Sequence, residues 1–156
     1  MTPAPLQRHF DLHLPTGRPL VPMEAAMVLV NRDADDVLNL IACAKIEWAF
    51  DIRTEKSERR EVRILGDSLM RYLGGENGTR DVDNWDYVVN LVLPGPSEIF
   101  IKSKNLARRF GCESQHMINL IREQTIEAAM YPAGGKQSPV VTRESVVRFL
   151  KARRIR

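Results

Sequence analysis

The second half of this 156-residue chain repeats a pattern that is already present in the first half. Asn39-Leu40-Ile41, followed by Ile46-Glu47, returns as Asn119-Leu120-Ile121, followed by Ile126-Glu127, at a constant offset of 80 residues. Weaker matches lie upstream and downstream at offsets of 79 and 77, and drifts of this size are what short deletions in loops leave behind. A repeat of this length is too long for a solenoid unit and suits a small domain.

The repeat predicts two similar modules rather than one continuous domain. We expect a first module over 1–75, a linker over 76–87 and a second module over 88–156. Modules of about 65 residues bury little surface on their own. We therefore expect the two modules to pack against one another.

Charge is distributed unequally between the two halves. Residues 1–97 hold 11 Lys or Arg and 15 Asp or Glu, a net charge of −4, whereas residues 98–156 hold 12 and 5, a net charge of +7; together they give the +3 of the whole chain. A small domain with a charge of +7 attracts polyanions, and nucleic acid is the first candidate. The alternative is an ordinary solvated surface.

Composition argues against several other classes. The hydrophobic content of 44% and the charged content of 28% are usual for a soluble protein, and no run approaches the ~18 apolar residues of a membrane span. The start of the chain lacks a basic-then-apolar leader pattern, so we expect a cytoplasmic, nucleoid-associated protein without a membrane partner. Two cysteines, Cys43 and Cys112, indicate buried free thiols rather than a disulfide framework or a zinc site.

Two short helices around a tight turn are predicted near the middle of the second module. The run Val88 to Leu93 is typical of a strand, and Pro94-Gly95-Pro96 of a turn after it. Ser103 is a suitable N-cap for a helix that ends near Gly111, and Ser114 for the next helix. Helices in this arrangement form a helix-turn-helix.

A β-hairpin and a third helix follow. Ile126 to Met130 and Val140-Val141 are predicted to pair as the two strands of the hairpin, or wing. Thr142 is expected to cap a helix over Arg143 to Arg153.

The second module resembles the winged helix-turn-helix of excisionases and MerR-type regulators. The resemblance lies in LARRFGCESQHMINLIREQTIEA and GGKQSPVVTRESVVRFL, and covers residues 99–153 well and 20–74 weakly. In this chain Cys112 replaces the usual Val, and Glu113 lengthens the turn by one residue. The resemblance implies an α+β fold of tandem winged helix-turn-helix modules, mostly helical with short β-hairpin wings, which bind double-stranded DNA without a cofactor.

The second predicted helix of this module is the candidate base reader. A recognition helix reads base edges with side chains near its N-terminal end, and Gln and Asn can pair with adenine and Arg with guanine. The candidate base-reading residues are Ser114, Gln115, His116, Asn119 and Arg122, and we expect Gln115, His116 and Asn119 to share one exposed face. A solvated helix face is the alternative for any one of them, but the flanking cations favour base reading.

Cations around this helix are candidates for phosphate contacts, which position a protein without reading sequence. The cations near the first helix are Lys102, Lys104, Arg108 and Arg109. At the wing tip the candidates are the cation Lys136 and the uncharged Gln137. We expect the tail from Lys151 to Arg156 to touch phosphates or to be a frayed end.

The first module is expected to be a degenerate copy. Its helices are predicted at 24–30, 34–44 and 67–73, and its hairpin strands at 49–52 and 61–65. The second helix starts among Asp33, Asp35 and Asp36, which phosphates would repel, so we expect this module to touch DNA through Arg59 and Arg60 of its wing or not at all. Otherwise it would pack on its twin or on another subunit. Its Trp48 and Phe50 fit a module core better than an anchor for a partner.

The expected function is therefore sequence-specific DNA binding, as a transcription regulator or as an excisionase-like factor of a mobile element or plasmid. A protein-interaction adaptor built on the same modules is the alternative. The sequence contains no phosphate-binding glycine loop, no metal-ligand cluster and no catalytic triad pattern, so we do not expect an enzyme, a metal site or a cofactor.

Overall fold

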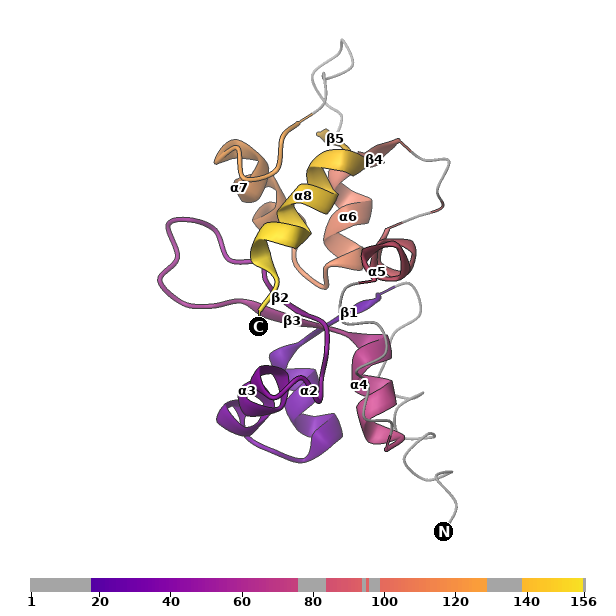
Figure 1. Cartoon of the computed structure of the whole chain (residues 1–156). Coiled ribbons are helices and arrows are strands. Elements are labelled where there is room, and N and C mark those ends of the chain that lie inside the picture. Colours follow the sequence, from indigo (N-terminus) through magenta and orange to yellow (C-terminus); the bar gives the residue numbers. More distant parts are fainter. Residues whose placement is uncertain (1–17, 76–83, 94, 96–98, 129–138, 156) are drawn as a thin grey trace.

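The computed structural model describes residues 18–75, 84–93, 95, 99–128 and 139–155, and in them the fold is α+β (Figure 1). Seven helices accompany a three-stranded and a two-stranded antiparallel sheet in this part of the chain. None of these helices has the length and apolar character that crossing a membrane requires.

The first half of the chain runs strand, helix, helix, strand, strand, helix. Its elements are β1 (Leu20–Pro22), α2 (Met23–Val30), α3 (Ala34–Ala42), β2 (Ala49–Asp51), β3 (Val62–Leu65) and α4 (Gly66–Leu73). The sheet order is β1-β3-β2, and Leu20 lies opposite Leu65 in the register. The predicted helices and hairpin strands of this half are confirmed, and each end lies within two residues of its predicted position.

The second half begins with an extra helix and then runs strand, helix, helix, strand, helix. Its elements are α5 (Trp85–Val92), β4 (Phe100–Lys102), α6 (Ser103–Arg109), α7 (Ser114–Arg122), β5 (Val140–Thr142) and α8 (Arg143–Arg153). Strand β4 pairs with β5, and Ala128 makes an isolated bridge to Val141 on the other side of β5. Of the predicted hairpin strand over Ile126 to Met130, Ala128 forms only this isolated bridge, and 129–130 lie outside the described residues. The tip of the expected wing, with Lys136 and Gln137, lies outside the described residues.

Backbone conformations recur at the same offset as the sequence. Asn31 after α2 and Gly111 after α6 both have positive φ, 54° and 63°. Ala44 after α3 and Gln124 after α7 do too, at 58° and 61°. The two halves therefore turn their chains at corresponding points, although the residue types differ.

Helix starts explain part of this architecture. The Thr142 hydroxyl accepts a hydrogen bond from the Ser145 amide at 3.2 Å, so the predicted cap of α8 is confirmed. The Asp33 carboxylate caps α3 in the same way, from the Asp36 amide at 2.8 Å. The predictions for Ser103 and Ser114 are wrong: each is the first residue of its helix, after Lys102 and Glu113, and neither of those caps uses its side chain.

The predicted strand over Val88 to Leu93 is also wrong, because this segment belongs to helix α5. Val88 and Val92 are four residues apart and both are fully buried, which is helical rather than strand spacing. The Asn84 side chain caps the helix by accepting from the Tyr87 amide at 3.2 Å. Helix α5 consequently includes 85–87, the last residues of the expected linker.

The core forms two clusters on the two faces of the three-stranded sheet. Val21, Ile64 and the helices of the first half form one cluster. The other face, with Trp48 and Phe50, is buried among residues of the second half. Figure 1 shows this sheet between α2, α3 and α4 on one side and the helices of the second half on the other. Trp48 and Phe50 thus belong to a core that both halves share.

The two thiols are free but have different surroundings. Cys43 is exposed, so the prediction of burial is wrong there; it is the residue directly after α3, where the helix ends. Cys112 is partly buried, and loss of solvation raises the pKa of its thiol from 9.0 to about 11, although Arg63 acts in the opposite direction.

We predict that iodoacetamide at pH 8 alkylates Cys43 much faster than Cys112. Only the thiolate reacts, and a pKa near 11 instead of 9.0 leaves Cys112 on the order of a hundredfold less thiolate at this pH. Mass spectrometry of a time course measures both rates. Labelling in urea is the control, since unfolding should bring the two rates together; equal rates in the native protein would contradict the prediction.

Candidate nucleic-acid interface

Helix α7 separates its side chains into a buried and an outward face. Met117 and Leu120 are fully buried and Ile121 nearly so. Gln115 and Arg122 are exposed on the opposite face, and Asn119 beside them is partly exposed. The Gln115 Nε2 donates to Asn119 Oδ1 at 3.0 Å, so these two amides form one polar surface.

His116 does not share this face, and the expectation that it stands beside Gln115 and Asn119 is wrong. Its Nε2 lies 2.6 Å from the carbonyl oxygen of Ile52, in the first half of the chain. One residue corresponds to a 100° rotation around a helix, which turns His116 from the outward face towards the neighbouring half. Ser114 is exposed at the first turn of the helix.

The turn between α6 and α7 is tight and lies against the first half. Gly111 N donates to Arg108 O at 3.1 Å, and Cys112 N donates to Ala107 O at 3.0 Å. A Cβ at Gly111 would lie only 2.9 Å from the Leu20 carbonyl oxygen. The contact with β1 therefore requires glycine at this position, and the positive φ favours it further.

The expected phosphate-binding cations divide into two groups. Lys102, Lys104 and Arg108 are exposed on β4 and α6. Arg109 is half-buried, and its guanidinium donates to Val92 O at 3.3 Å, which ties α6 to α5. Arg109 is thus placed as a structural contact, while the other three present their charge to solvent.

Arg153 and Arg154 contact the first half of the chain, so the alternative of a frayed end is wrong for these two residues. The Arg154 guanidinium lies 3.6 Å from the Trp48 ring centroid and 5.8 Å from that of Trp85. It also donates to Glu47 O at 3.0 Å, and Ile155 N donates to Ala49 O at 2.9 Å. The tail extends the three-stranded sheet beside β2, with a bridge between Phe50 and Arg154.

The loop between β2 and β3 lies next to α7. The Glu55 amide donates to Glu123 Oε2 at 2.9 Å, and the His116 contact lies at the start of the same loop. Arg59 and Arg60 are exposed on this loop. The sequence predicted these two arginines on a hairpin of the first half, but it did not reveal that this loop adjoins the helix of the second half.

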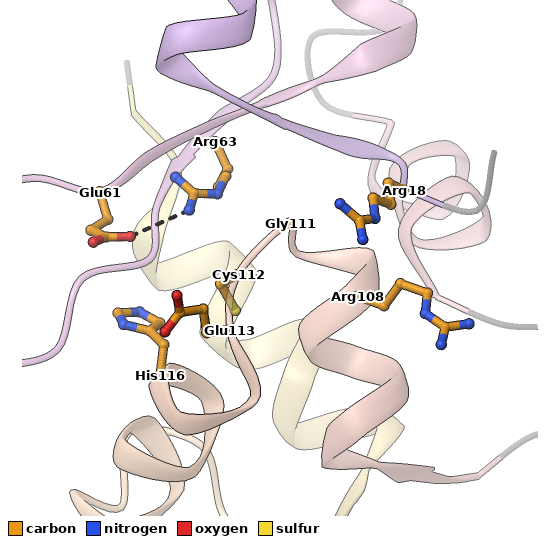
Figure 2. Close-up of a pocket in the computed structure, with 8 residues that line it drawn as sticks. All are labelled: Arg18, Glu61, Arg63, Arg108, Gly111, Cys112, Glu113 and His116. Carbon is orange, nitrogen blue, oxygen red and sulfur yellow. Dashed lines mark hydrogen bonds and ion pairs between the residues drawn. The ribbon is translucent and has the colours of Figure 1, made fainter. Parts of the chain in front are cut away.

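A polar cavity of about 560 Å³ lies where the two halves meet (Figure 2). Arg63 spans the junction, donating from Nε to Phe110 O at 3.1 Å and from Nη2 to Glu61 Oε2 at 3.4 Å. The lining residues are Arg18, Glu61, Arg63, Arg108, Gly111, Cys112, Glu113 and His116. Three arginines and two glutamates leave a small positive excess at the beginning of α7.

The corresponding helix of the first half has the opposite charge at its start. Asp33, Asp35 and Asp36 surround the first turn of α3, and Asp33 is its cap. These carboxylates stabilise the helix start through its dipole. An anionic ligand would be repelled from this end of α3, which leaves α7 as the helix suited to a polyanion.

Comparison with protein-family models, with curated proteins and with solved structures found no match. In the described residues, no group of three or more His, Cys, Asp or Glu is placed to hold a metal ion. The arrangement of α7 offers amide and guanidinium groups to an external ligand, with cations of α6 and of the β2–β3 loop nearby.

Proposed function

We propose that the protein binds double-stranded DNA in a sequence-specific manner, with α7 as the recognition helix of a winged helix-turn-helix. The outward face of α7 is the observation that carries this proposal. Gln115, Asn119 and Arg122 project from a helix whose other side is held in the core. These side chains are of the types that read adenine and guanine edges in the major groove.

The phosphate contacts would come from both halves. Lys104 and Arg108 on α6 carry exposed charge beside the recognition helix, and Arg59 and Arg60 do so on the adjoining loop of the first half. Cations on two sides of a reading helix can fix its register on the duplex. The first half thus acts as a support for α7 and as a second wing, while its own α3 is kept from DNA by carboxylates.

A role as a transcription regulator or as an excisionase-like factor, in the cytoplasm and bound to the nucleoid, follows from this proposal. The adaptor alternative is favoured by the exposed Val28, 61% accessible beside Asp33. A protein that ignored DNA but bound a defined protein through this surface would support the adaptor instead.

We predict that Gln115→Ala with Asn119→Ala weakens binding to a selected DNA site on the order of 100-fold. Each bidentate base contact contributes about 1–3 kcal/mol. The site would first be selected from random duplex DNA, and fluorescence anisotropy would then measure affinity at several salt concentrations. Affinity should fall steeply with salt, because bound cations release counterions from the duplex.

Asn39→Ala is the matched control, because Asn39 is exposed at the equivalent position of the acidic helix α3. We expect it to leave affinity unchanged, and we expect the double variant to retain its weak binding to unrelated DNA. Failure to select any site, or equal binding of the native protein and the double variant, would refute the proposal.

A further inference from the structure

The outer face of the sheet is buried in the first half and exposed in the second half. Registers make Phe100 and Thr142 equivalent to Leu20 and Leu65, since Leu20 pairs with Leu65 and Phe100 with Thr142. Leu20 and Leu65 are 1% exposed, because the second half covers them. Phe100 is 62% exposed and Ile99 beside it is 65% exposed. The second half therefore leaves open an apolar face that the first half buries.

In the first half, this sheet face is covered by the turn between α6 and α7, which belongs to the second half. Phe110 O accepts from Arg63, and Gly111 lies against β1. The equivalent turn of the first half, between α2 and α3, is uncovered among the described residues. Beside this turn, Val28 is exposed in the last turn of α2, next to a shallow depression of about 520 Å³ lined by Glu24, Met27, Val28, Asn31, Arg32 and Asp33.

Charge favours contact between these two surfaces. Lys102 and Lys104 are exposed next to Phe100 on β4 and at the start of α6. Asp33 and Asp35 are exposed beside the α2–α3 turn. Opposite charges around two apolar patches steer association and suppress contact between like surfaces.

We propose that the chain self-associates head to tail, with the exposed Phe100 face of β4 in one copy on the α2–α3 turn, beside Val28, of a second copy. The contact inside one chain is the template for the contact between chains. Exposed apolar patches rimmed by charge mark interaction sites. The two surfaces differ, so the association is heterologous and adds further copies unless it closes into a ring.

The contact between chains is looser than its template. The template needs Gly111, where a Cβ would approach the Leu20 oxygen to 2.9 Å, and the second copy presents Asn31 at the equivalent position. Its Cβ keeps the α2–α3 turn further from β4. We therefore expect a reversible, concentration-dependent assembly.

The experiment is sedimentation of the full-length protein without DNA, over a concentration series and at two salt concentrations. Native protein should assemble, and more weakly at high salt, where the charges are screened. Phe100→Lys and Val28→Lys should each be monomeric alone, because each lacks one of the two surfaces. Mixed together they should form a dimer and nothing larger, since each variant retains the surface that the other has lost.

Leu91→Lys is the control, an exposed apolar residue of α5 that belongs to neither surface. It should assemble like the native protein, and circular dichroism should show all variants folded. A monomer at every concentration overturns the proposal. A dimer that persists in Val28→Lys also overturns the proposal, because such a dimer would form symmetrically through β4 of both copies and not through the α2–α3 turn. Both measurements are made without DNA, so their outcome does not depend on whether the protein binds DNA as proposed.

Discussion

Replacing Trp48 with alanine is expected to lower the free energy of unfolding by about 3–5 kcal/mol. Its side chain is 1% exposed and forms an edge-to-face pair with Trp85, whose ring centroid lies 4.9 Å away. The Arg154 guanidinium also contacts Trp48 and lies 3.6 Å from its ring centroid. Alanine would leave a cavity in the core that both halves share and would remove the ring to which the C-terminal tail is attached.

The loss should affect both halves together. Calorimetry of the native protein is expected to give one transition, and the variant should give one transition at lower temperature, because Trp48 belongs to the cluster that includes Phe110 and Phe149. Two separate transitions, with that of the second half unmoved, would contradict a shared core. Leu91→Ala is the control for an exposed apolar residue and should change little.

Trp48→Phe offers a graded comparison. The Trp48 Nε1 has no hydrogen-bond partner among the described residues, so phenylalanine loses ring area without losing a hydrogen bond. We expect its destabilisation to be well below that of alanine. A loss as large as that of alanine would mean that the indole nitrogen, rather than the ring, stabilises the junction.

Local signals in the sequence were sufficient for most elements of the two halves. The apolar spacing of α7 and the Thr142 cap depend on neighbouring residues, and the structure has both where the sequence places them. Helix α5 was missed because its adjacent Val88 and Val89 favour strands. The spacing of Trp85, Val88 and Val92 is helical, and it was the better signal.

Contacts between distant segments could not be predicted in this way. Nothing local to Arg154 indicates that it lies over Trp48, more than a hundred residues earlier, and a basic tail favours the simpler interpretation of phosphate binding. His116 was misplaced for the same reason, since its partner Ile52 lies in the other half. In the candidate interface, the helix was therefore predictable, while the adjoining loop of the first half was not.

The two halves differ at corresponding positions. Both contain the two helices and the turn between them, but aspartates surround the start of α3, whereas α7 begins with the uncharged Ser114 and Gln115. The first half also has Trp48 and Phe50, which are buried against the second half. These differences place a shared core between the halves, and Gly111 lies at one of their close contacts.

Gly111→Ala is expected to destabilise the protein by about 2–5 kcal/mol. A left-handed conformation costs a residue with a side chain about 1–2 kcal/mol, and overpacking at a tight contact costs about 1–3 kcal/mol more. Both apply here, because φ is 63° and the new Cβ would lie 2.9 Å from the Leu20 carbonyl oxygen, a backbone atom that cannot rotate away. Chemical denaturation monitored by tryptophan fluorescence measures the loss, since both tryptophans lie at the junction.

Gly75→Ala separates the two causes. Its φ is 80°, but no atom of the described residues beyond its chain neighbours lies within 4 Å of the new Cβ, so only the conformational cost applies. We expect Gly111→Ala to exceed this control by at least about 1 kcal/mol, the part that arises from the contact between the α6–α7 turn and β1. If the two variants lost the same stability, the turn would not press on β1 as described, and the close junction between the halves would have to be abandoned.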